Sequence, residues 1–133
     1  LKPLPQADGY CMNIIFNGNI LISGKNNKNL LRYSIVSNTF VTIPYDFAIG
    51  KRKILINSER LYLIECGYNG SVYESEVSND SVWRRIGDSI IDDEFSQGYF
   101  IYNKGAINIA HCRFDGIKYF KFNLKEKTLE QLV

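Results

Sequence analysis

The chain has 133 residues, the length of a single domain, and 45% of them are hydrophobic, which is enough to fill a core. A net charge of +2 gives no bulk electrostatic reason to expect binding to nucleic acid or to a membrane surface. No apolar run approaches the ~20 residues of a membrane-spanning helix, so we expect no membrane partner. The three cysteines, an odd and small number, favour reduced thiols and a cytoplasmic location.

Short alternating strands separated by turn residues fill the first third of the chain. Residues 1–9 contain two prolines near Leu4 and are predicted to be a handover from a preceding blade. Asn17-Gly18 is a strong signal for a two-residue hairpin, because both residues accept positive φ. We predict four strands in this unit, at residues 10–16, 19–23, 30–36 and 40–43.

The same arrangement follows twice more, and no segment has the 3.6-residue periodicity of a helix. The second unit carries turn signals at Asn57-Ser58 and Asn69-Gly70, and the third at Asp115-Gly116. Residues 44–51 and 87–97 are predicted to cross from one unit to the next. The predicted strands are 53–56, 60–65, 71–77 and 82–86 in the second unit, and 99–102, 106–112, 117–124 and 128–132 in the third.

Equivalent residues recur at a nearly constant period. The first set is Ile20, Leu61 and Ile107, separated by 41 and 46 residues. The second set is Ile35, Val77 and Leu124, which follow the first by 15, 16 and 17 residues. A period in the forties made only of strands is typical of propeller blades. We therefore predict an all-β fold with three four-stranded antiparallel sheets, at residues 10–49, 51–90 and 97–132. Because propellers usually close with about four to eight blades, residues 1–133 are predicted to be one partial domain of a larger propeller.

The pattern of glycine and aromatic residues resembles kelch-type propeller repeats. A kelch repeat has an apolar strand ending in glycines, a Tyr in the next strand and a Trp opening the last. The corresponding residues here are Ser23-Gly24, the tyrosines Tyr33, Tyr73 and Tyr119, and Trp83 with Phe40 and Leu129 in its place in the other units. The resemblance implies a module that binds other proteins. It also predicts that Trp83 is a buried structural residue.

We found no residue pattern typical of a catalytic or metal site. The only histidine, His111, is next to Cys112, and adjacent residues of a strand point to opposite faces. Zinc sites usually contain closely spaced ligand pairs, which are absent. We expect Cys66 and Cys112 to be buried small residues, with a disulfide or a shared metal as the alternative. The acidic residues Asp88, Asp92, Asp93 and Glu94 are predicted to form a solvated loop rather than a calcium site. We therefore expect no cofactor, no metal and no catalytic residues.

The turns between second and third strands and the crossings between units are predicted to emerge on one side of the fold. Mixed aromatic and charged loops on a rigid scaffold suit protein recognition. The lysines and arginines are scattered, so a protein partner is expected rather than nucleic acid. The predicted partner-binding residues are Lys25, Lys28, Tyr45, Phe47, Arg52, Tyr68, Asp92, Glu94, Phe95, Arg113 and Phe114. Two alternatives stay open: an enzyme with catalytic residues in further blades, and a structural subunit of a large assembly.

Overall fold

The computed structural model describes residues 11–89, 91, 98–126 and 128–132. In these ranges the chain forms three four-stranded antiparallel sheets and no helix, as predicted. No helix long and apolar enough to span a membrane occurs within the same ranges. In every sheet the strands follow one another in chain order, so each sheet is a simple meander.

Tight turns with left-handed residues define the strands of the first two sheets. Asn17 and Gly18 have φ values of 50° and 74°, which matches the predicted hairpin. Sheet 1 contains β1 (Cys11–Phe16), β2 (Asn19–Gly24), β3 (Leu30–Ser34) and β4 (Thr39–Ile43). Sheet 2 contains β5 (Lys53–Asn57), β6 (Leu61–Glu65), β7 (Ser71–Glu76) and β8 (Asn79–Asp88).

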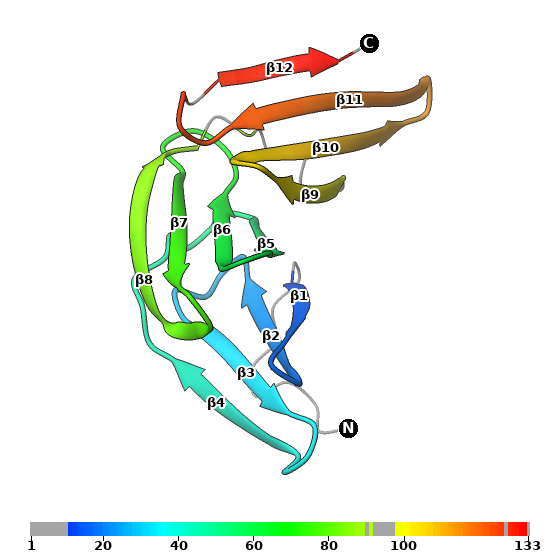
Figure 1. Cartoon of the computed structure of the whole chain (residues 1–133). Helices are drawn as coiled ribbons and strands as arrows, with labels where there is room; N and C mark the ends of the chain where they lie inside the picture. Colours follow the sequence, from blue (N-terminus) through cyan, green and yellow to red (C-terminus); the bar gives the residue numbers. More distant parts are fainter. Residues whose placement is uncertain (1–10, 90, 92–97, 127, 133) are drawn as a thin grey trace.

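Sheet 3 completes the described chain. It contains β9 (Tyr99–Asn103), β10 (Ala106–Arg113), β11 (Gly116–Asn123) and β12 (Thr128–Leu132). Figure 1 shows the first strands, β1, β5 and β9, on the inner side of the three sheets and the last strands, β4, β8 and β12, along the outer edge. Strand β5 contacts both β1 and β9, and the Asn57 side chain donates a hydrogen bond to the Ile15 carbonyl at 3.0 Å. This arrangement is consistent with propeller blades.

Two hydrophobic clusters hold the sheets together, and sheet 2 contributes to both. Leu61 and Leu63 of β6 face sheet 1, while Tyr62 and Ile64 of the same strand face sheet 3. This double burial explains why β6 has a continuous apolar sequence. From sheet 1, the first cluster includes Phe16, Leu21, Leu30 and Ile43. From sheet 3, the second cluster includes Ile107, Ile109 and Phe122.

Trp83 is buried, as predicted. Its side chain is 7% exposed, and its indole N–H donates a hydrogen bond to the Asp80 carbonyl at 2.8 Å. The Asp80 carboxylate forms an ion pair with Arg32 of sheet 1 at 2.7 Å. The segment that positions Trp83 in sheet 2 is therefore also joined to sheet 1.

Large apolar side chains are exposed on the outer face of sheet 3. Tyr99, Ala110, Tyr119 and Leu132 form one row of cross-strand neighbours through all four strands. Tyr99 is 71% exposed and Tyr119 is 47% exposed. Tyr119 therefore points away from the core, whereas Tyr73 of sheet 2 is buried. The expected equivalence of these two tyrosines does not extend to their environments.

The outer faces of sheets 1 and 3 differ, and one expectation about the cysteines needs correction. Leu31 and Tyr33 on the outer face of sheet 1 are 8% and 5% exposed, so the centre of this face is buried, unlike the outer face of sheet 3. Cys66 is buried, whereas Cys112 is exposed. Cys112 is exposed because it lies within β10, in the outer-face row that pairs it with Ile117. The expectation of two equivalent buried cysteines is therefore wrong for Cys112.

Candidate interaction surface

Three segments that are distant in sequence join at one end of the fold. The first is the β2–β3 turn, the second is the crossing between sheets 1 and 2, and the third is the β6–β7 turn. We call these segments, residues 25–29, 44–52 and 66–70, the loop surface. Backbone hydrogen bonds tie the first to the second, from Phe47 N to Lys28 O at 3.1 Å and from Gly50 N to Lys25 O at 2.8 Å. Cys66 N donates to Arg52 O at 2.8 Å and thereby ties the third segment to the second.

The next crossing continues this surface. Gly67 N donates to Ile91 O, and Ser89 N donates to Gly70 O, both at 2.8 Å. The Lys51 ammonium also donates to the Tyr68 carbonyl. Gly70 fits where a side chain could not, because a Cβ there would lie 2.3 Å from the Glu65 carbonyl oxygen. Backbone and side-chain hydrogen bonds therefore fix these loops to one another and to the ends of the sheets.

A buried lysine binds the backbone carbonyls at the start of the β2–β3 turn. Lys53 is 4% exposed, and its ammonium donates to the carbonyl oxygens of Gly24 at 2.8 Å and Lys25 at 3.4 Å. A third hydrogen bond reaches the Lys51 carbonyl at 3.3 Å. A buried ammonium needs several acceptors to offset the loss of water. Lys53 thus fixes the position of the first part of the loop surface.

A buried glutamate holds the other two segments. Glu65, directly opposite Lys53 in the β5–β6 register, is 2% exposed. One carboxylate oxygen accepts a hydrogen bond from Ser71 N at 2.9 Å, and the other accepts one from Ala48 N in the crossing. The sequence analysis did not assign a role to either residue. The sequence did contain a signal: a charged residue adjoins each apolar run. Lys53 begins the run Lys-Ile-Leu-Ile, and Glu65 ends the run Leu-Tyr-Leu-Ile-Glu.

Aromatic packing anchors the crossing. The centroid of the Phe47 ring lies 4.9 Å from that of Tyr73 and 5.5 Å from that of Trp83, both in edge-on contact. Tyr45 packs against Phe47 in a tilted arrangement, with centroids 4.4 Å apart. Burial, with the nearby Glu65 carboxylate as the second cause, raises the pKa of Tyr73 above its usual range. Tyr73 therefore keeps its phenolic proton to higher pH than a solvent-exposed tyrosine.

The structure brings together part of the predicted partner-binding set. Lys28 and Tyr68 are exposed on the loop surface, and Tyr68 is 88% exposed. The neighbouring residues Lys25, Tyr45 and Arg52 are half-buried there. Phe47 does not belong to the exposed part, because its side chain is 2% exposed and packs in the core.

Of the remaining predicted residues, Arg113 and Phe114 lie elsewhere, and three fall outside the described residues. Phe114 is fully exposed in the β10–β11 turn, but this turn projects away from the β6–β7 turn (Figure 1). Arg113 ends β10 beside it. Asp92, Glu94 and Phe95 lie outside the described residues. The loop surface is therefore defined by sheets 1 and 2.

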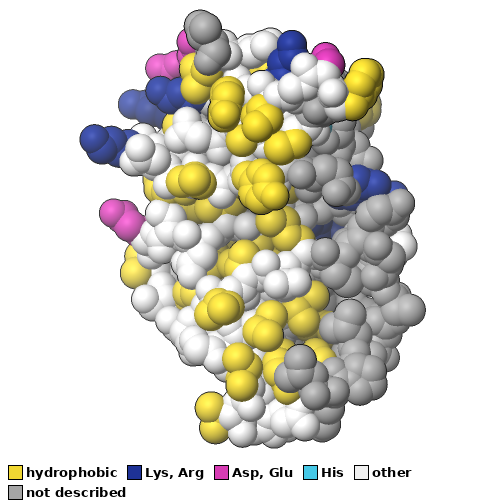
Figure 2. Space-filling model, turned by 90° about the vertical axis from the view of Figure 1, so that its right-hand side faces the viewer, with side chains coloured by type: hydrophobic (Ala, Val, Ile, Leu, Met, Phe, Trp, Pro, Cys, Tyr) yellow, Lys and Arg dark blue, Asp and Glu magenta, His cyan; other side chains and the backbone are white. Residues whose placement is uncertain are grey.

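A groove lies on the side of the first strands, β1, β5 and β9. Figure 2 views this side and shows hydrophobic side chains gathered down its middle. A groove of about 460 Å³ is lined there by Met12 and Ile14 of β1, residues 55–57 of β5 and residues 98–102 in and before β9. In the described part of the chain, no three His, Cys, Asp or Glu side chains are grouped to hold a metal ion.

Comparison with known proteins does not assign this chain to a family. No family model matches it, and no curated protein matches its sequence. The similarity to propeller blades therefore depends on the three four-stranded sheets and their order.

Proposed function

We propose that this protein is a non-catalytic protein-interaction module, an adaptor or scaffold of the kelch-like propeller type, that binds a partner protein through the loop surface. The supporting observation is that three distant segments are hydrogen-bonded into one continuous surface above the buried Lys53 and Glu65. Such a pre-organised surface loses little conformational entropy on binding. Further sheets of the same type, from the same or another chain, complete the propeller.

The exposed residues of the loop surface suit recognition of a protein. Tyr68 offers a large ring that can be buried in a partner, and tyrosine is enriched at binding hot spots. Lys28, which is exposed on the same loop surface, adds a positive charge that can steer association and select partners. The kelch resemblance, given by Ser23-Gly24, Tyr33, Tyr73 and Trp83, supports the same function.

The test is quantitative affinity enrichment from an extract of the source cells. The tagged parent protein is compared with Tyr68→Ala and Lys28→Glu on the loop surface. The matched control is Val36→Ser, because Val36 is 97% exposed and lies in the β3–β4 turn, outside the loop surface. We expect at least one protein to be retained by the parent and the control but lost with both loop variants. Equal enrichment with all four proteins, or no specific enrichment, would contradict the proposal.

A further inference from the structure

A polar cavity of about 390 Å³ lies at the other end of sheet 2 from the β6–β7 turn. Its charged lining comes from Arg60 just before β6, Glu74 and Glu76 of β7, and Arg84 of β8. Glu74 is directly opposite Arg84 in the β7–β8 register. The antiparallel pairing therefore places Glu74 and Arg84 side by side on one face of the sheet, with Arg60 next to them. The volume is in the range of small-ligand sites, ~300–1,000 Å³.

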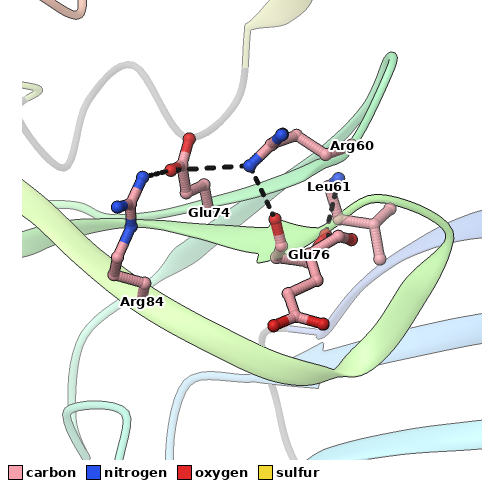
Figure 3. A network of polar contacts seen from close by, with 6 residues as sticks. Arg60, Leu61, Glu74, Glu76 and Arg84 are labelled. Atoms are coloured by element: carbon pink, nitrogen blue, oxygen red, sulfur yellow. Dashed lines mark hydrogen bonds and ion pairs between the residues drawn. The ribbon is translucent and has the colours of Figure 1, made fainter.

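Two arginines converge on a single carboxylate in this cavity. The Glu74 side chain is 12% exposed, and its Oε1 atom forms an ion pair with Arg84 and lies 3.6 Å from Nη1 of Arg60. Figure 3 shows the two guanidinium groups on either side of Glu74, with the Glu76 carboxylate pointing away from both. Two guanidinium groups thus flank one carboxylate, whereas Glu76, the other acidic residue of the lining, points away from them.

Both guanidinium groups keep donors for a ligand. A guanidinium has about five N–H donors. Arg84 uses Nη2 on Glu74, and Arg60 uses Nη1 on Glu74 and on the Ser75 carbonyl, at 3.6 and 3.5 Å. The side chains of Arg60 and Arg84 are 34% and 73% exposed, so the other donors are accessible. The fork of donors on an arginine matches the two oxygens of a carboxylate.

We propose that this cavity is a second binding site, which takes the carboxylate of an acidic side chain from a partner protein. A carboxylate placed between Arg60 and Arg84, opposite Glu74, completes a ring of alternating charges. Val82 on the cavity wall is 44% exposed and provides an apolar contact for the methylene stem of a glutamate. The site is separate from the loop surface and goes beyond the function proposed above.

Calorimetry is the primary measurement of this site. The only tryptophan, Trp83, precedes Arg84 in β8 and borders the cavity, but its ring packs in the cluster between sheets 1 and 2, so its fluorescence is an indirect second readout. The probe is an acetylated and amidated tri-glutamate peptide, titrated into the full chain and followed in parallel by calorimetry. We expect saturable binding that weakens with added NaCl, because salt screens exposed charges over about 10 Å at 0.1 M. A tri-lysine peptide should not bind. Tighter binding of inorganic phosphate than of the peptide would overturn the carboxylate assignment.

Three arginine variants provide the decisive comparison. Arg60→Gln and Arg84→Gln should each weaken tri-glutamate binding by about tenfold or more, the effect of one charge-assisted hydrogen bond. The matched control is Arg85→Gln: Arg85 follows Arg84 but contacts Ser71 and Asp88. This control should retain the parent affinity, as should Tyr68→Ala on the loop surface. The proposal fails if neither method detects saturable binding, or if Arg85→Gln weakens binding as much as the two cavity variants.

Discussion

Trp83 combines three contacts that make it a structural residue. Its ring is buried against Phe47, its N–H is satisfied by the Asp80 carbonyl, and it lies in the cluster between sheets 1 and 2. We expect Trp83→Ala to lower the free energy of unfolding by about 3–5 kcal/mol, the usual range for a large buried aromatic. Urea unfolding followed by far-UV circular dichroism measures this loss. Tyr68→Ala, an exposed aromatic residue, is the control, and an equal effect of both substitutions would refute the structural role.

Tyr62 carries a pH-dependent part of the stability between sheets 2 and 3. Its ring stacks on Tyr102 with centroids 4.7 Å apart. Burial, followed by the side-chain hydrogen bond with Tyr102, raises the pKa of Tyr62 well above its usual range. The folded state therefore keeps a proton that the unfolded chain releases near pH ~10. The resulting stabilisation is complete below this pH and is lost as the pH rises above it.

We therefore expect the Tm of the parent to fall more steeply above pH ~10 than that of Tyr62→Phe. Phenylalanine keeps most of the ring packing but has no proton to lose. Thermal unfolding between pH ~8 and ~11 measures the two slopes. Tyr68→Phe, which removes an exposed hydroxyl, should behave like the parent. Identical slopes for the parent and Tyr62→Phe would contradict this account.

Two buried charged side chains, Lys53 of β5 and Glu65 of β6, join their strands to the three segments of the loop surface. Glu65→Gln replaces one acceptor oxygen by an amide group that donates, which leaves a buried N–H of Ala48 or Ser71 without its acceptor. We expect the substitution to cost about 1.5–3 kcal/mol, the usual worth of hydrogen bonds to a charged group. Hydrogen exchange should also accelerate at the amides of Ala48 and Ser71. Exposed Glu59→Gln is the control, and unchanged exchange at both amides would contradict this role for Glu65.

Most strand ends could be predicted from the sequence because turn residues mark them. Asn17-Gly18 and Asp115-Gly116 adjoin strands at the expected places, and β12 has the predicted bounds. Strand β3 ends at Ser34, two residues before its predicted end at residue 36. The largest difference is in β8, which begins at Asn79 and ends at Asp88 rather than spanning residues 82–86. Its pairing with β7 contains register shifts at Val72/Tyr73 and Ser75/Glu76. Such irregularities let a strand continue through residues that break the alternating pattern, and they depend on the partner strand.

The candidate surface was less predictable than the strands. The grouping of loops follows from the meander, so Lys28 and Tyr68 could be placed on one side. The burial of Phe47 could not be predicted, because Tyr73 and Trp83, which cover it, are distant in sequence. The roles of Lys53 and Glu65 were missed for the same reason: their acceptors and donors are backbone atoms of remote turns.

At the scale of the whole molecule, the outer face of sheet 3 predicts association. Contiguous exposed apolar side chains are a liability for a soluble monomer. We expect residues 1–133, expressed alone, to self-associate as concentration rises in analytical ultracentrifugation. Tyr119→Lys on this face should reduce the association, whereas Val36→Lys, at the 97% exposed position in the β3–β4 turn, should not. A stable monomer at all concentrations would show that the three sheets are sufficient by themselves.

Sheet 2, the sheet that contributes to both hydrophobic clusters, has a consequence for local unfolding. Each sheet is a meander of sequence neighbours, so an outer sheet can open without breaking the hydrogen bonds within the other two. Opening sheet 2 requires both clusters to separate. We expect native-state hydrogen exchange to be slowest at the amides of Leu55 and Leu63. Of all the amides within strands, those of sheet 3 should exchange fastest. Equal protection in all three sheets would indicate a single cooperative unit. With the expected gradient, proteases would cut the chain first in sheet 3 and last in the sheet that supports both the loop surface and the arginine cavity.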